Sequence, residues 1–176
     1  VPRQCRKSTL IERMLNDFNR YKLVYRLQYS KDYQKLLKDP SLIVDDVEDR
    51  IKLEPVILFI DEVQKVPSIL DDCQYLIDKY KKNITILLTG SSARKLRYKG
   101  VNLLPGRIFS EYLYPLTFPE IMHVKDQKIL PVKVNNSVKE EISLNDLLIY
   151  GSLPGILSED RKYKAKSLKT YTEIYL

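Results

Sequence analysis

The sequence predicts an α/β fold in which a mainly parallel sheet is flanked by helices. Residues 56–60 and 84–88 form short, uninterrupted apolar runs, which are typical of strands buried on both faces of such a sheet. Segments with helical spacing of apolar residues alternate with these runs, and that order favours a parallel sheet. A chain of 176 residues with 44% apolar content is long enough to bury one sizeable core.

The elements follow from apolar spacing and from turn residues. The predicted helices are residues 8–21, 36–52 with a break near Pro40, 67–82 with Pro67 near the start, and 91–99. The predicted strands are residues 22–30, the two buried runs 56–60 and 84–88, and 106–116 as an exposed or edge strand. Two closing helices, residues 144–157 and 158–176, complete the pattern, with glycine and proline residues marking a turn before the second.

The domain organisation is predicted from a change in composition after residue 123. Residues 1–123 carry the strand and helix pattern, whereas residues 124–142 are polar and pattern-poor and are predicted to be a flexible linker. Residues 143–176 are predicted to be a short helical segment that leads into a further C-terminal domain. The chain starts without Met and stops inside a helical pattern, so we expect a truncated protein.

Composition excludes several classes of protein. The apolar runs are too short to span a bilayer and no signal segment precedes them, so we expect a cytoplasmic protein without membrane contact. Cys5 and Cys73 lack metal-ligand spacing and are expected to be free thiols. His123 is the single histidine, which leaves little material for a histidine-based metal site.

The net charge of +7 is concentrated at the two ends of the chain. Basic ends of this kind contact nucleotide phosphates or a nucleic-acid backbone in some proteins, and in others form only solvated helix faces. Both interpretations remain open, and so does nucleic acid as a partner. The basic residues at the ends are Arg3, Arg6, Lys7, Arg13, Arg20, Lys22 and Arg26, then Arg161, Lys162, Lys164, Lys166 and Lys169.

The first residues raise the question of a phosphate-binding loop. Such a loop is written G-x-x-x-x-G-K-[ST], because glycines let backbone amides surround phosphate oxygens while Lys and Ser/Thr reach the terminal phosphate and Mg²⁺. Lys7 and Ser8 stand at the last two positions, but Val1 and Arg6 occupy the two glycine positions. The segment is therefore either a phosphate loop without its glycines or a basic helix start that resembles one.

Polar side chains follow both buried strands. Asp61 and Glu62 come directly after residues 56–60, and Thr89 and Ser91 follow residues 84–88. Carboxyl ends of parallel strands meet at one edge, where a phosphate site needs an acidic residue for Mg²⁺. We expect Asp61 to hold Mg²⁺, Glu62 to polarise the attacking water, and Thr89 or Ser91 to sense the γ-phosphate. An ordinary loop start or a helix cap would also explain these residues.

These motifs carry a family resemblance that covers nearly the whole chain. The segments are PRQCRKSTL, VILFIDEVQKVPSILDDCQYLIDKYKK, ILLTGSSARKL, LPGRIFSEYLYPLTFPEI and YGSLPGIL. They resemble prokaryotic AAA+-type P-loop ATPases, whose loop reads G-P-R-Q-x-G-K-[ST]-T and whose Walker B segment reads D-E-x-Q-K-V-P. The resemblance implies an ATP-binding domain with a P-loop NTPase fold, with ATP and Mg²⁺ as cofactors and a C-terminal domain beyond.

The resemblance also implies residue roles. Lys7 would contact the β- and γ-phosphates, Ser8 and Asp61 would hold Mg²⁺, and Glu62 would be the catalytic carboxylate. Arg107 would act as a catalytic finger from a neighbouring subunit, although a surface arginine at a strand start would look the same. The residues implied to surround the nucleotide are Arg3, Gln4, Arg6, Lys7, Ser8, Thr9, Thr89 and Ser91.

Two departures from the family pattern limit what is expected. If residue 6 needs a positive φ, its Cβ costs about 1–2 kcal/mol, which would weaken ATP binding about tenfold. The family's first strand, ahead of the loop, is missing, so a protein partner or self-association would have to cover the exposed neighbours. The sequence thus predicts an ATP-binding domain with weak or no hydrolysis. The alternative is a nucleotide-free remnant that acts as a basic protein- or DNA-interaction module.

Overall fold

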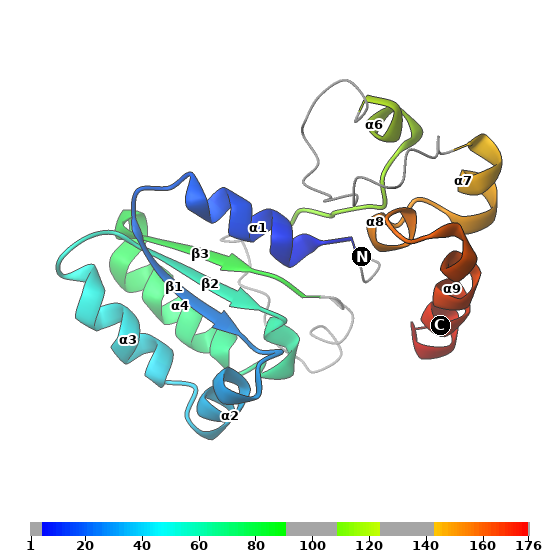
Figure 1. The fold of residues 1–176 in the computed structure, drawn as a ribbon. Coiled ribbons are helices and arrows are strands. Elements are labelled where there is room, and N and C mark those ends of the chain that lie inside the picture. Colours follow the sequence, from blue (N-terminus) through cyan, green and yellow to red (C-terminus); the bar gives the residue numbers. More distant parts are fainter. Residues whose placement is uncertain (1–4, 91–108, 124–142, 176) are drawn as a thin grey trace. The chain divides into compact units, whose positions relative to one another are not determined.

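The computed structural model describes residues 5–90, 109–123 and 143–175 (Figure 1). The described chain divides into two compact units. The first unit lies within Lys7–Tyr112, and the second contains Cys5, Arg6 and the described residues of Leu113–Leu176. The predicted linker, residues 124–142, lies outside the described residues.

A parallel sheet forms the centre of the first unit. Its strands are β1 (Tyr21–Arg26), β2 (Val56–Asp61) and β3 (Ile84–Leu88), in the order β1-β2-β3. Both pairs are parallel, with Arg26 opposite Asp61 and Ile60 opposite Leu88. The three carboxyl ends therefore meet at one edge of the sheet. This arrangement confirms the predicted α/β class and agrees with a P-loop NTPase core.

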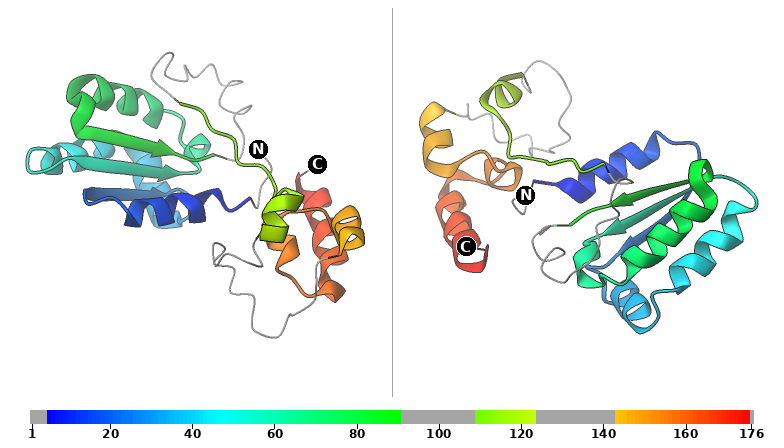
Figure 2. Two further views of the ribbon diagram at one scale, coloured as in Figure 1. Left: turned by 90° about the horizontal axis from the view of Figure 1, so that it is seen from above. Right: turned by 180° about the vertical axis from the view of Figure 1, so that it is seen from behind.

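Helices cover both faces of this sheet (Figures 1 and 2). The helices of the first unit are α1 (Lys7–Asn16), α2 (Ser30–Lys38), α3 (Leu42–Ile51) and α4 (Ile69–Tyr80). On one face Leu58 and Ile60 join a core cluster with residues of α2, α3 and α4, and on the other Ile57 and Phe59 pack against Leu15 of α1. Every residue of β2 is buried, which explains its uninterrupted apolar run.

The helix boundaries follow local signals in the sequence. Pro40 lies between α2 and α3, as predicted, and Asp39 closes the turn because its Oδ1 accepts from the Ser41 backbone N at 3.0 Å and from the Ser41 hydroxyl at 2.6 Å. Two short 3₁₀ helices complete the connections of this unit: η1 (Val63–Lys65) after β2 and η2 (Lys81–Asn83) after α4.

Two strand predictions need correction. β3 was predicted to be buried like β2, but only Ile84 is buried and Thr85 is exposed, because the described residues supply β3 with one neighbouring strand, β2. The alternating segment 106–116 was predicted as a strand, but its described part, residues 109–116, contains none, and Phe109 is 97% exposed. Alternation alone does not form a strand, since a strand needs a partner for its backbone groups. The predicted helix 91–99 lies outside the described residues.

The second unit is helical. It contains α6 (Phe118–His123), α7 (Leu144–Tyr150), α8 (Pro154–Leu157) and α9 (Arg161–Tyr175). Ser143 and Asp146 form a reciprocal capping box at the start of α7. Gly151 ends α7 with a φ of 71°, and Pro154 then starts α8. The first predicted closing helix, residues 144–157, is therefore two helices, while the second matches α9.

Two expectations from composition can be compared with the described residues. None of the helices described in the structure has the length and apolar character needed to cross a membrane. Cys5 and Cys73 are both buried and are not joined in a disulfide, in agreement with the predicted thiols. Burial raises the pKa of the Cys73 thiol to about 12, so this thiol stays protonated at neutral pH.

Candidate functional site

The amino end of α1 forms one side of the candidate site. Lys7, Ser8 and Thr9 occupy the first turn of this helix, and that turn contains no acidic residue. The first backbone N–H groups of a helix lack intrahelical partners, and the helix dipole places partial positive charge at this end. Together with the Lys7 ammonium group, they make this helix end favourable for an anion such as phosphate.

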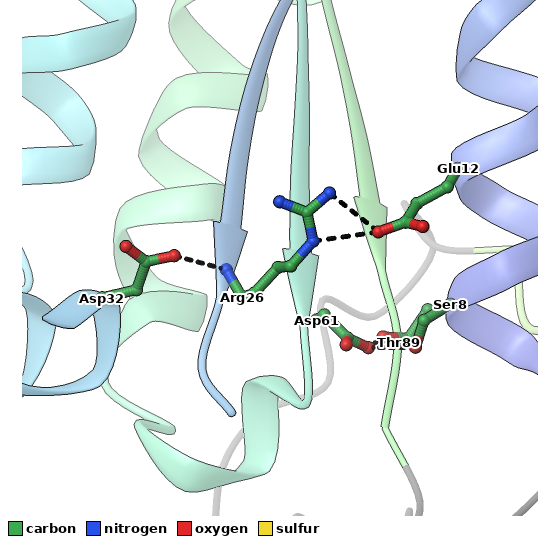
Figure 3. A network of polar contacts seen from close by, with 6 residues as sticks. All are labelled: Ser8, Glu12, Arg26, Asp32, Asp61 and Thr89. Carbon is green, nitrogen blue, oxygen red and sulfur yellow. Dashed lines mark hydrogen bonds and ion pairs between the residues drawn. The ribbon is translucent and has the colours of Figure 1, made fainter. Parts of the chain in front are cut away.

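Asp61 lies opposite this helix end, as the last residue of β2. The Ser8 hydroxyl donates a hydrogen bond to Asp61 Oδ1 at 2.7 Å, and the Thr89 hydroxyl donates to the same oxygen. Figure 3 shows the three side chains pointing toward one another from α1, β2 and the segment after β3. The structure thus brings together three residues that are far apart in the sequence and that were predicted to share this site.

Asp61 and Thr89 are buried polar residues with hydrogen-bond partners at this edge. Asp61 is only 5% exposed and Thr89 only 8%. The Leu27 backbone N donates to the Asp61 carbonyl at 3.1 Å, and the Thr89 N donates to the Ile60 carbonyl at 3.0 Å. The end of β2 is therefore held from both sides, and the Asp61 carboxylate keeps a defined direction.

Glu62, the predicted catalytic carboxylate, directly follows Asp61 and has an unusual backbone. Its φ is 60° and its ψ is 45°, which is the left-handed region that glycine normally occupies. For a residue with a Cβ this conformation costs about 1–2 kcal/mol. Thr89 offsets part of that cost, because its Oγ1 accepts from the Glu62 N at 3.3 Å and its carbonyl accepts from the Val63 N at 3.0 Å.

Arg6, which precedes α1 directly, has a φ of 56°. The backbone at the second glycine position of the loop motif is therefore left-handed, although the residue there is arginine. This is the positive φ for which a cost was expected from the sequence. The side chain is exposed, and its guanidinium group donates to the Ser158 hydroxyl at 3.5 Å within the second unit. Left-handed backbone is compatible with a phosphate-binding turn, but the Cβ makes it costly.

Two further residues at this edge were not predicted from the sequence. Arg26, at the end of β1, binds Glu12 of α1 through Nε at 2.9 Å and through a terminal nitrogen at 2.8 Å, as Figure 3 shows. This pair connects the helix to the sheet beside Asp61. Gln64, in η1, donates its side-chain amide to the Glu62 carboxylate. The signal for Arg26 was its position at a strand end. No pattern pointed to Gln64.

Four predicted site residues lie outside the described residues. They are Arg3, Gln4, Ser91 and Arg107. Their predicted roles, and that of Thr9 in the exposed first turn of α1, stay predictions.

A comparison with known protein families agrees with the α/β fold and the site described above. Residues 2–122 match the model of a family described as AAA domain. The chain belongs to the AAA domain family. The match covers all but the first position of the loop motif, together with α1, the three described strands and the acidic pair Asp61 and Glu62, which agrees with the resemblance drawn from the motifs. A comparison with curated protein sequences finds no significant match.

The residues at this edge of the AAA domain fit Mg²⁺ bound with a nucleotide. Mg²⁺ prefers oxygen ligands and is commonly held by one or two protein groups, with water and substrate phosphates completing its shell. The Ser8 hydroxyl and the Asp61 carboxylate, 2.7 Å apart, are such a pair of oxygen donors. Within the part of the chain that the structure describes, no three His, Cys, Asp or Glu side chains gather as a metal cage.

Proposed function

We propose that this AAA domain binds ATP together with Mg²⁺ at the carboxyl edge of its sheet and hydrolyses it slowly or not at all. The observation that carries the proposal is the hydrogen bond between Ser8 and Asp61, because it joins the first turn of α1 to the end of β2. ATP with Mg²⁺ would supply the phosphates and the cation that these two elements are arranged to receive.

Each residue has a defined task in this proposal. Lys7 neutralises the β- and γ-phosphates, while Ser8 and Asp61 provide oxygen atoms for the cation. Thr89 holds the direction of the Asp61 carboxylate through its hydroxyl group. Glu62 orients and polarises the attacking water. The arginine at position 6 and the proposed dependence on Arg107 from another subunit are the reasons for expecting slow turnover in the isolated chain.

Titration with a fluorescent ATP analogue and Mg²⁺ tests the proposal. We expect saturable binding that is lost in Lys7→Ala and weakened in Asp61→Asn. Lys52→Ala is the matched control, because it removes one positive charge from an exposed lysine at the end of α3, which precedes β2 and so lies toward the opposite edge of the sheet. Its affinity should equal that of the parent protein.

The nature of the ligand can be resolved with the same assay. Competition by ATP, ADP and AMP should weaken in that order, because each lost phosphate removes contacts with α1. Removal of Mg²⁺ should reduce the affinity of the parent but have little further effect on Asp61→Asn. Absence of Lys7-dependent binding would refute the proposal and would favour the alternative, a basic module that contacts protein or DNA.

A further inference from the structure

The turn after β2 brings two side chains together that normally point apart. Glu62 caps the 3₁₀ helix η1, and Gln64 lies two residues further on, within that helix. Residues at this separation do not share a helical face. The left-handed backbone of Glu62 changes the direction of its side chain, so that Nε2 of Gln64 donates a hydrogen bond to Oε2 of Glu62.

The chemistry of the two groups determines how they meet. An ionised carboxylate only accepts hydrogen bonds, so the amide must present its NH₂ group to Glu62. Hydrogen bonds to a charged acceptor are shorter and stronger than those between neutral groups. The contact therefore restrains the rotation of the Glu62 side chain.

Gly90 provides the space for this contact. A Cβ built on residue 90 would lie 2.7 Å from Oε1 of Gln64, closer than real Cβ atoms approach such an oxygen. Gly90 directly follows Thr89, which already holds the Glu62 backbone. Thr89 thus bonds to the main chain of Glu62, and Gly90 leaves room for the Gln64 amide that bonds to the Glu62 carboxylate.

We propose that Gln64 is a positioning residue that directs the Glu62 carboxylate toward the attacking water, and that Gly90 is required because any side chain there displaces Gln64. The inference rests on the proposed function, since it concerns the water that would attack bound ATP. It goes beyond that function because it assigns roles to two residues outside the phosphate and Mg²⁺ contacts.

The first experiment separates nucleotide affinity from turnover in the full chain. Gln64→Ala should bind the ATP analogue with Mg²⁺ as the parent does, while turnover per bound nucleotide falls about tenfold. The expected loss is smaller than the full contribution of a general base, because Glu62 itself is retained. Gln34→Ala is the matched control, because Gln34 is an exposed glutamine in α2. Should Gln64→Ala fail to fold, Gln64→Met keeps the length of the side chain and removes only the amide.

A double-mutant cycle tests the role of Gly90. Gly90→Ala should lower turnover about as much as Gln64→Ala and leave affinity unchanged. In the Gln64→Ala background it should have no further effect, because the oxygen it displaces is gone. The side-chain amide resonance of Gln64, identified by its loss in Gln64→Ala, should also shift in Glu62→Ala and in Gly90→Ala.

The outcomes distinguish this inference from the proposed function. Absence of Lys7-dependent binding in the parent refutes the function itself. Binding with unchanged turnover in Gln64→Ala, or with additive effects in the cycle, overturns only the role of Gln64. Binding by a parent without detectable turnover also overturns it, because no reaction then depends on the direction of Glu62. If the Gln64 amide resonance does not shift in Glu62→Ala, the hydrogen bond between Gln64 and Glu62 is contradicted.

Discussion

Replacement of Arg6 by glycine should stabilise the folded chain. Arg6 has a φ of 56° although it carries a Cβ, and this conformation costs about 1–2 kcal/mol that glycine avoids. Glycine also has more conformational freedom in the unfolded chain, and the loss of this freedom on folding reduces the gain in stability by roughly 0.5–1 kcal/mol. The expected net gain is about 1 kcal/mol, corresponding to a rise in Tm of roughly 2–4 °C for a chain of this size.

The informative comparison is between Arg6→Gly and Arg6→Ala. Both variants lose the guanidinium group and its hydrogen bond to Ser158, but only alanine keeps the Cβ. Thermal unfolding followed by circular dichroism should show Arg6→Gly melting above Arg6→Ala. Equal midpoints, or a higher midpoint for alanine, would refute the argument that the backbone at this position is strained.

The same two variants test the expected effect on nucleotide binding. If the cost of the Cβ falls on the nucleotide-bound form, Arg6→Gly should bind the ATP analogue about tenfold more tightly than Arg6→Ala. Equal affinities would contradict that prediction and would assign the whole cost to folding.

Three further predictions concern the first unit. Thr89→Val should lower the free energy of unfolding by about 1–3 kcal/mol, because it removes one of the two hydroxyl groups that donate to the buried Asp61 carboxylate, whereas Thr89→Ser should not; equal losses in urea unfolding would count against this. Burial alone would raise the pKa of Asp46, but hydrogen bonds led by that from Lys35 lower it, so stability should fall as acid protonates the group below pH 3.8. The difference in the free energy of unfolding between Asp46→Asn and the parent should therefore be present at pH 7 and shrink as the pH falls below 3.8, as measured by urea unfolding. Cys73 should react with a thiol reagent only after denaturation, since burial raises its pKa to about 12; rapid labelling of the native chain would contradict its burial.

Strong apolar patterns predicted most of the first unit. The run that became β2 is buried at every residue, and the break at Pro40 separates α2 from α3 as expected. These predictions worked because burial on both faces and the missing N–H of proline act locally. Position in the chain also placed Asp61 beside Thr89, since parallel strands carry their last residues to a common edge.

Predictions failed where structure depends on partners that a pattern does not reveal. Residues 109–116 alternate like a strand, but pairing is decided by a neighbouring strand. The contact between Gln64 and Glu62 depends on a left-handed glutamate, and a non-glycine residue gives no sequence signal for that conformation. At Arg6 the motif itself was the signal, because the position it assigns to glycine is left-handed in the fold.

The backbone at residue 6 also has a genetic consequence. Every arginine codon becomes a glycine codon through a single base substitution. Since the main chain at this position already has a conformation that glycine prefers, such a change would require no rearrangement of the turn before α1. At residue 6, therefore, one mutational step separates the present chain from the glycine of the loop motif.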